Sequence, residues 1–253
     1  MTDYKVRDGY ALVLRTCNAD MTSHGGFRWP ESGPVECLDW DPRPECGHGL
    51  HGLLWGSGDG SLLSWKPDAK WIVAEVDASQ VVDLVGKVKC PRASVIYAGD
   101  RGTATELIAR HAPSGTVIIG HTATAGDRGT ASVGYRGAAT AGDCGSATAG
   151  DGGTATAGYR GTASAGDCGS ATAGDSGTAS AGYGGTASAG DGGTASAGYR
   201  GTASAGYGGT IMIRYIDGRL RVRVGYIGED GLLPGVKYRL DDNGNFVRAE
   251  DGR

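Results

Sequence analysis

The sequence lacks the features that mark membrane and nucleic-acid-binding proteins. No apolar run approaches the roughly 18 residues that a membrane-spanning helix requires. The segment from Met1 to Asp8 contains no apolar stretch typical of a signal peptide. The net charge is only −4 over 253 residues, which gives no electrostatic reason to bind nucleic acid or an anionic membrane. We therefore expect a cytoplasmic protein that has neither of these partners.

Closely spaced cysteine pairs are absent as well. A structural zinc site usually starts from a Cys-x2–4-Cys pair, whereas Cys37, Cys46, His48 and His51 are spaced without one. These four side chains are only weak metal candidates, and we expect neither a metal nor another cofactor. We interpret the two cysteines as small buried apolar side chains. The alternative, a catalytic Cys–His pair that uses His51, rests on spacing alone.

Glycine is abundant, with 48 residues, but the Gly-x-y period of collagen is absent. The glycines belong instead to an eight-residue unit, Thr-Ala-Thr/Ser-Ala-Gly-Asp/Tyr-x-Gly, which occurs eleven times without insertion from Thr122 to Gly209. So short and strict a period predicts a solenoid and excludes an ordinary globular core over residues 122–209.

Each unit predicts a strand of about four residues followed by a tight Gly-Asp/Tyr-x-Gly turn. Because side chains alternate along a strand, Ala123 and Ala125 would point inward while Thr122 and Thr124 point outward. Alanine is small enough for two such strands to pack back to back, which leaves a flat hydroxylated outer surface. We attribute the turn aspartates and glycines to their tolerance of positive φ, since one carboxylate per turn is too few for a calcium site.

The number of units in one coil is open between two and three. Two units give a flattened, two-sided coil of 16 residues, and three give a triangular coil of 24. The 24-residue coil is supported by the string Asp-Cys-Gly-Ser-Ala-Thr-Ala-Gly, which starts at Asp143 and again 24 residues later at Asp167. Alanine side chains are too small to fill the centre of a triangle with such long sides. We therefore favour the 16-residue coil.

The unit that starts at Asp143 and the unit Tyr-Gly-Gly-Thr-Ala-Ser-Ala-Gly that starts at Tyr183 resemble the two half-repeats of bacterial ice-nucleation proteins. This resemblance implies a 16-residue β-solenoid whose outward Thr-x-Thr-like rows organise water or ice. One face would consist of Thr122, Thr124, Thr140, Thr154, Thr156, Ser170, Thr172, Thr186, Ser188, Thr202 and Ser204. The other face would consist of Thr130, Ser132, Ser146, Thr148, Thr162, Ser164, Thr178, Ser180, Thr194 and Ser196. The resemblance also implies a homodimer edge of stacked tyrosines at Tyr183, Tyr199 and Tyr215.

The whole chain resembles uncharacterised proteins encoded by bacteriophages and prophages. This second resemblance rests on Cys46-Gly-His-Gly-Leu-His51, on the central repeats, and on the segment from Gly228 to Tyr238. It implies a bacterial host and brings no established activity. The alternative function is therefore a phage-associated structural or interaction module, in which the solenoid is a rigid scaffold for an unknown protein partner.

Four regions follow from these patterns. We expect an α+β domain over residues 1–113, a connector over 114–121, the solenoid over 122–209 and a C-terminal β cap over 210–253. In the first region, strands are expected at Tyr10–Arg15, Trp71–Val76, Gln80–Val85 and Ala93–Tyr97, and a helix at Thr103–His111.

The cap is indicated by a change of chemistry in an unbroken register. Ile211 and Ile213 replace the inward alanines, while Tyr215 is expected to keep the turn position. The alternating segment Arg219–Val224 is expected to be an edge strand whose arginines discourage further pairing. The sequence thus predicts a mainly β, capped β-solenoid protein without enzyme activity.

Overall fold

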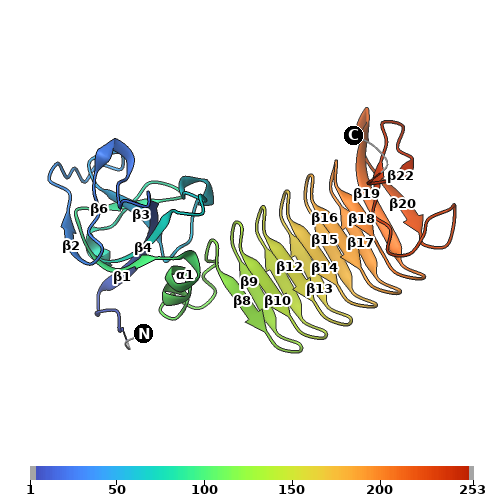
Figure 1. Cartoon of the computed structure of the whole chain (residues 1–253), viewed down its shortest axis with the longest axis horizontal. Coiled ribbons are helices and arrows are strands. Elements are labelled where there is room, and N and C mark those ends of the chain that lie inside the picture. Colours follow the sequence, from blue (N-terminus) through green and yellow to red (C-terminus); the bar gives the residue numbers. More distant parts are fainter. Residues whose placement is uncertain (1–3, 251–253) are drawn as a thin grey trace. The chain divides into compact units, whose positions relative to one another are not determined.

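The computed structural model describes residues 4–250 and separates into two compact units, the first ending at His121 and the second starting at Thr122. Strands dominate both units (Figure 1), so the expected mainly β fold class is confirmed. In the described part of the chain, no helix is long and apolar enough to cross a membrane.

The first unit is built on one antiparallel sheet with the strand order β2-β7-β4-β1-β3-β6-β5. Its central strands β1 and β4 are nearly continuous apolar runs and are buried on both faces. One short helix, α1, contacts β1, β4 and β7. The strands are β1 (Tyr10–Cys17), β2 (Gly33–Glu36), β3 (Leu50–Leu54), β4 (Lys70–Asp77), β5 (Val82–Asp83), β6 (Val88–Cys90) and β7 (Arg92–Gly99).

Two expected elements of this unit differ in the structure. The helix α1 spans Arg101–Ala109 and starts before the expected Thr103, because the Asp100 side chain caps it by accepting the Thr103 N–H at 2.9 Å. The expected strand Gln80–Val85 is reduced to the two residues of β5. Gln80, the first residue of the expected strand, belongs instead to a 3₁₀ turn, Ala78–Gln80, which the Asp77 side chain caps.

From Thr122 to Ile213 the second unit is a β-solenoid, in which strands two apart along the chain pair in parallel (Figure 1). Ala139 lies opposite Ala123 on one side and Ala155 on the other, so equivalent residues are 16 apart. The two-sided coil of 16 residues is confirmed, and the triangular coil of 24 is excluded. The strands are β8 (Thr122–Ala125), β9 (Thr130–Val133), β10 (Ala138–Ala141), β11 (Ser146–Ala149), β12 (Thr154–Ala157), β13 (Thr162–Ala165), β14 (Ser170–Ala173), β15 (Thr178–Ala181), β16 (Thr186–Ala189), β17 (Thr194–Ala197) and β18 (Thr202–Ser204).

The solenoid core is a double layer of alanine. Ala147, Ala155, Ala163 and Ala171 are 0% exposed, and they alternate between the two sheets. The hydroxyl-bearing residues on the same strands point away from this layer, as the exposed Thr162 beside Ala163 shows. The inward assignment of the alanines is therefore correct. Cys144 and Cys168 lie in turns at opposite edges of the flattened coil, because one turn follows β10 and the other follows β13.

The turns depend on glycine at both ends. Gly145 donates its N–H to the Gly142 carbonyl at 3.1 Å and closes the turn. A Cβ atom at Gly150 would lie 2.9 Å from the carbonyl carbon of Gly134 on the preceding coil, so only glycine fits there. Positive φ falls on the residue before the closing glycine, for example 55° at Cys144. The prediction that the turn aspartates occupy this conformation was wrong, because each aspartate precedes that position by one residue.

The turn aspartates instead join one coil to the next. The Asp167 carboxylate accepts the Tyr183 N–H at 2.7 Å, and the Asp167 N–H donates to the Asp151 carboxylate at 2.9 Å. The same contact recurs at the opposite edge, where Tyr207 N–H donates to Asp191 at 2.7 Å. Each carboxylate thus satisfies a backbone donor of the following coil.

Replacing Asp167 with alanine is expected to lower the free energy of unfolding by about 0.5–1.5 kcal/mol, because the Tyr183 N–H loses its acceptor. Asp167→Asn keeps an oxygen at the same position and is expected to stay close to the wild-type chain. Urea denaturation followed by circular dichroism measures both. An equal loss for the two variants would show that the hydrogen bond is not the cause.

The cap begins as one more coil and then departs from it. Strand β19 (Thr210–Asp217) pairs with β17, and Ile211 and Ile213 are buried, as expected. Where a turn was expected, β19 continues, and Tyr215 pairs with Arg221 of β20 (Arg219–Tyr226). The assignment of Tyr215 to a turn was therefore wrong. The reason is that the paired glycines are missing there, and the hairpin turns at Gly218 instead.

The remaining strands close the end of the alanine core. Strand β21 (Tyr238–Leu240) pairs with β18 and with β22 (Phe246–Arg248). Leu232 and Tyr238 are buried with the last alanines, and the Tyr238 and Phe246 rings meet edge to face with their centroids 6.4 Å apart. Larger apolar side chains thus pack against the last alanines and fill the core where the alanine stack ends.

Candidate functional site

The outward side chains form two hydroxylated faces. The first face, on strands β8, β10, β12, β14, β16 and β18, carries Thr122, Thr124, Thr140, Thr154, Thr156, Ser170, Thr172, Thr186, Ser188, Thr202 and Ser204. The second face, on strands β9, β11, β13, β15 and β17, carries Thr130, Ser132, Ser146, Thr148, Thr162, Ser164, Thr178, Ser180, Thr194 and Ser196. These are the two groupings that the sequence predicts.

The two faces differ in chemistry. On the first face, Thr124, Thr140, Thr156 and Thr172 stand in one row on four consecutive coils. The equivalent row of the second face contains one threonine, Thr148, among serines. Threonine is stiff at χ1 and adds a methyl group beside its hydroxyl, and the first face has eight threonines where the second has five. The other row of the second face also contains consecutive threonines, at Thr162, Thr178 and Thr194.

The C-terminal end of the first face is less open to water. Thr202 donates its hydroxyl to that of Thr186 at 3.1 Å, and Ser204 donates to Ser188 at 3.0 Å. Ser204 is only 6% exposed, so its predicted place on an open surface was wrong. The reason is that β18 is followed in its sheet by β21 of the cap rather than by another coil. The open part of this face therefore lies toward the N-terminal coils.

The second face ends in apolar side chains. Thr210 pairs with Tyr226, and Met212 pairs with Val224, so each hydroxyl row continues into a large apolar residue of β20. Val222 and Tyr226 are 53% and 56% exposed. The strongly alternating sequence of β20 is the signal for this surface, although the repeats themselves give no hint of it.

The expected tyrosine edge is present in part. The Tyr183 and Tyr199 rings lie on adjacent coils with centroids 6.0 Å apart, and Arg200 donates to the Tyr183 hydroxyl at 3.2 Å. Tyr215 lies beyond them in β19 and packs against the backbone of Gly244 in the cap. Tyr183 is 45% exposed, so this edge offers aromatic surface to solvent.

The thiol and imidazole candidates of the first unit pair with other groups. Cys46 is exposed and lies 3.0 Å from Lys87 Nζ, which lowers the pKa of its thiol. The interpretation of Cys46 as buried was therefore wrong. His48 lies 2.8 Å from Asp39, and Cys37, which is half-buried, donates to the same carboxylate at 2.9 Å. Among residues 4–250, no three His, Cys, Asp or Glu side chains are grouped so as to hold a metal ion.

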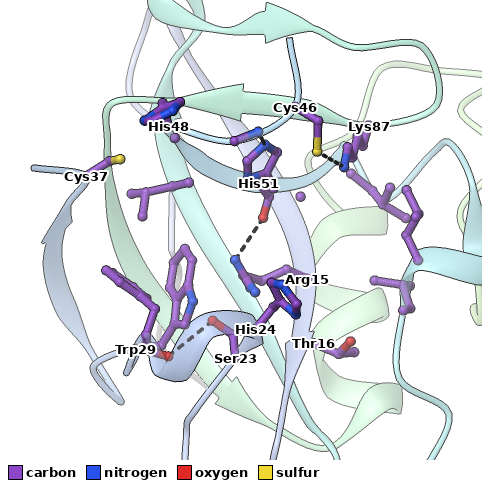
Figure 2. Close-up of a pocket in the computed structure, with 18 of the residues that line it drawn as sticks. Arg15, Thr16, Ser23, His24, Trp29, Cys37, Cys46, His48, His51 and Lys87 are labelled. Carbon is purple, nitrogen blue, oxygen red and sulfur yellow. Dashed lines mark hydrogen bonds between the residues drawn. The ribbon is translucent and has the colours of Figure 1, made fainter. Parts of the chain in front are cut away.

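A Cys–His catalytic pair is not formed by these residues. His51 Nε2 accepts the Gly47 N–H at 3.4 Å, whereas the Cys46 thiol pairs with Lys87. Burial lowers the pKa of His51, so the ring is uncharged at neutral pH. These groups surround a cavity shown in Figure 2.

Two comparisons place the chain among known proteins. Residues 11–110, within the first unit, match a family described as a domain of unknown function (DUF7666). The chain is also similar to ice nucleation protein InaU of Pantoea ananas, with 44% identity over 108 residues, which is 42% of this chain and 10% of that protein. The ice nucleation protein of Pseudomonas syringae is 47% identical over 100 residues, 39% of this chain and 9% of that protein. That of Xanthomonas campestris pv. translucens is 45% identical over 104 residues, 40% of this chain and 7% of that protein.

The chain thus spans a tenth or less of the length of these curated relatives. No solved structure matches it. Together, the relatives and the fold define a tandem-repeat β-solenoid protein of the ice-nucleation-like kind. The resemblance of the whole chain to phage and prophage proteins stays a prediction.

Proposed function

We propose that the first face organises water and that the protein acts at ice or ordered water without enzyme activity. The observation that carries this proposal is the row of four consecutive threonines, flanked on the same sheet by a second row in which three of the four residues, all but Ala138, carry a hydroxyl. The names of the relatives, which are ice nucleation proteins, support it.

The geometry of a parallel solenoid supports this function. Coils repeat at about 4.8 Å, and outward residues two apart on a strand are separated by about 6.6 Å. The hydroxyls therefore form a two-dimensional lattice whose spacing is set by the backbone. The exposed Thr122, Thr124, Thr140, Thr154 and Thr172 contribute to this lattice. A fixed lattice of donors and acceptors holds adjacent waters in repeating positions at little entropic cost, because the array is already ordered.

Self-association through Tyr183 and Tyr199 is part of the proposal. Aromatic side chains supply a large contact area for little loss of side-chain entropy. Two copies joined at this edge would place their hydroxyl faces side by side and enlarge the array. We also propose that the protein functions in the cytoplasm of a bacterial host.

Ice-crystal shaping by the purified chain tests the proposal. Crystals grown slowly in its presence are expected to develop facets, because water ordered on the first face matches the ice surface. Crystals that stay round at high protein concentration would contradict the proposal. That outcome would favour the alternative, a rigid scaffold that docks a protein partner, which the exposed apolar residues Leu220, Val222 and Val224 of β20 support.

A further inference from the structure

The first unit contains a cavity of about 600 Å³ that the solenoid function does not use. Its walls come from β1, β3, the segment before β2, the loop before β3, and Leu62, Leu63 and Lys87 further along the chain. Figure 2 shows Arg15, Trp29 and His51 among the residues that line it. The apolar part of the lining is made by Phe27, Trp29, Leu53, Leu62 and Leu63. Cavities of this size and composition hold small organic molecules.

A single arginine gives this apolar cavity a positive charge. Arg15 stands near the end of the apolar strand β1, and its guanidinium lies over the Trp29 ring at 4.2 Å from the centroid. Its Nη1 donates to the His51 carbonyl at 3.1 Å (Figure 2), while its Nε is buried without a partner among the described residues. Burial lowers the pKa of Arg15 to about 10, so the group remains charged at neutral pH.

The other charged groups at the cavity have partners already. Lys87 pairs with the Cys46 thiol at 3.0 Å, and Asp39 pairs with His48 at 2.8 Å. Arg15 forms no ion pair with any carboxylate in residues 4–250. Arg15 is half-buried, with its Nε fully covered. A desolvated cation without a counter-charge is unfavourable, and an anion entering the cavity would supply the missing partner.

We propose that this cavity binds a small organic anion with an apolar body, whose anionic group pairs with Arg15. The apolar body would lie against Trp29, Phe27 and the leucines of the lining. An aryl or medium-chain carboxylate, sulfonate or phosphate has this chemistry. The site belongs to the first unit, and it is independent of the ice-related function proposed for the solenoid.

Two fluorescent probes with one apolar body test the charge requirement on the full-length wild-type chain. We would titrate the anion 8-anilinonaphthalene-1-sulfonate and its uncharged analogue N-phenyl-1-naphthylamine. The anion is expected to bind about tenfold or more tightly than the neutral probe, since a charge-assisted contact is worth that much. Equal affinities, or no binding of the anion, would overturn the proposal. Competition by octanoate and by phenyl phosphate then ranks the carboxylate and the phosphate.

The thiol at the cavity locates the bound probe. Cys46 lines the cavity, whereas Cys144 and Cys168 are exposed in solenoid turns and serve as internal references. Saturation with the anionic probe is expected to slow alkylation of Cys46 by iodoacetamide several-fold and to leave the two references unchanged, as read by peptide mass spectrometry. Unchanged labelling of Cys46 would place the probe elsewhere and overturn the proposal.

A variant then tests Arg15 itself. Arg15→Met keeps much of the side-chain stem and is expected to weaken binding of the anionic probe about tenfold or more, while binding of the neutral probe stays similar. Arg92→Met is the matched control. Arg92 lies on β7 of the same sheet, is exposed and pairs with Glu36, so this variant is expected to bind both probes as the wild type does. An equal loss of affinity for the anionic probe in both variants would overturn the proposal. If circular dichroism shows that Arg15→Met does not fold, the probe titration and the Cys46 labelling of the wild-type chain still test the proposal.

Discussion

Replacing Ala163 with leucine is expected to lower the free energy of unfolding by about 1–3 kcal/mol, because the added carbons have no space between the two sheets. Ala163 is 0% exposed and stacks between Ala147 and Ala179 on the neighbouring coils of its sheet. Alanines of the opposite sheet pack against it. A leucine there must push the sheets apart or leave its preferred rotamer, and the adjacent coils prevent both.

Thr162→Leu is the matched control, since Thr162 is the adjacent residue on the same strand and points to solvent. It is expected to change stability much less than Ala163→Leu does. Urea denaturation of both variants checks this. Equal tolerance of leucine at the two positions would contradict the inward packing of alanine.

Ice nucleation by the chain is expected to depend strongly on assembly. Eleven repeat units make about five and a half coils, or a stack of roughly 26 Å at about 4.8 Å per coil. A surface that short orders only a small patch of water, whereas a stable ice embryo at mild supercooling requires a far larger one. Monomers are therefore expected to shape crystals weakly and to leave the freezing temperature of droplets close to that of buffer.

Size-fractionated samples test this dependence. Droplets that contain assembled fractions are expected to freeze at clearly higher temperature than droplets that contain monomer at the same mass concentration. Replacing Tyr183 and Tyr199 with alanine is expected to reduce assembly and freezing together. Tyr207→Ala, at the opposite edge and 72% exposed, is the control. Strong nucleation by a fraction shown to be monomeric would contradict the size argument.

The solenoid could be predicted from sequence because one rule governs each position. Strict alternation of threonine and alanine sets the two faces, and the small volume of alanine selects the flattened coil, so the places of Ala163 and Thr162 follow directly. The aspartate contacts could not be predicted in the same way. They join Asp167 to Tyr183 across coils, which requires the spacing of the turns in three dimensions.

The ends of the repeat and the first unit were harder to predict for a different reason. Ser204 has the sequence context of an exposed residue, and only the pairing of β18 with β21 covers it. Tyr215 has the spacing of a turn residue, but the turn glycines are absent. Arg15 interrupts an apolar strand, which is a visible signal. Its unpaired charge, however, depends on which side chains the folded sheet brings near it.

The most direct test of the central claim is ice-crystal shaping by matched variants of the two faces. The first-face variant has lysine in place of Thr124, Thr140, Thr156 and Thr172. The second-face variant has lysine in place of Ser132, Ser164, Ser180 and Ser196. Both variants change one row at four positions, and circular dichroism confirms that each remains folded. The first-face variant is expected to lose crystal shaping, and the second-face variant is expected to retain most of it. A folded first-face variant that shapes ice as well as the wild-type chain would contradict the assignment of the threonine row as the surface that organises water.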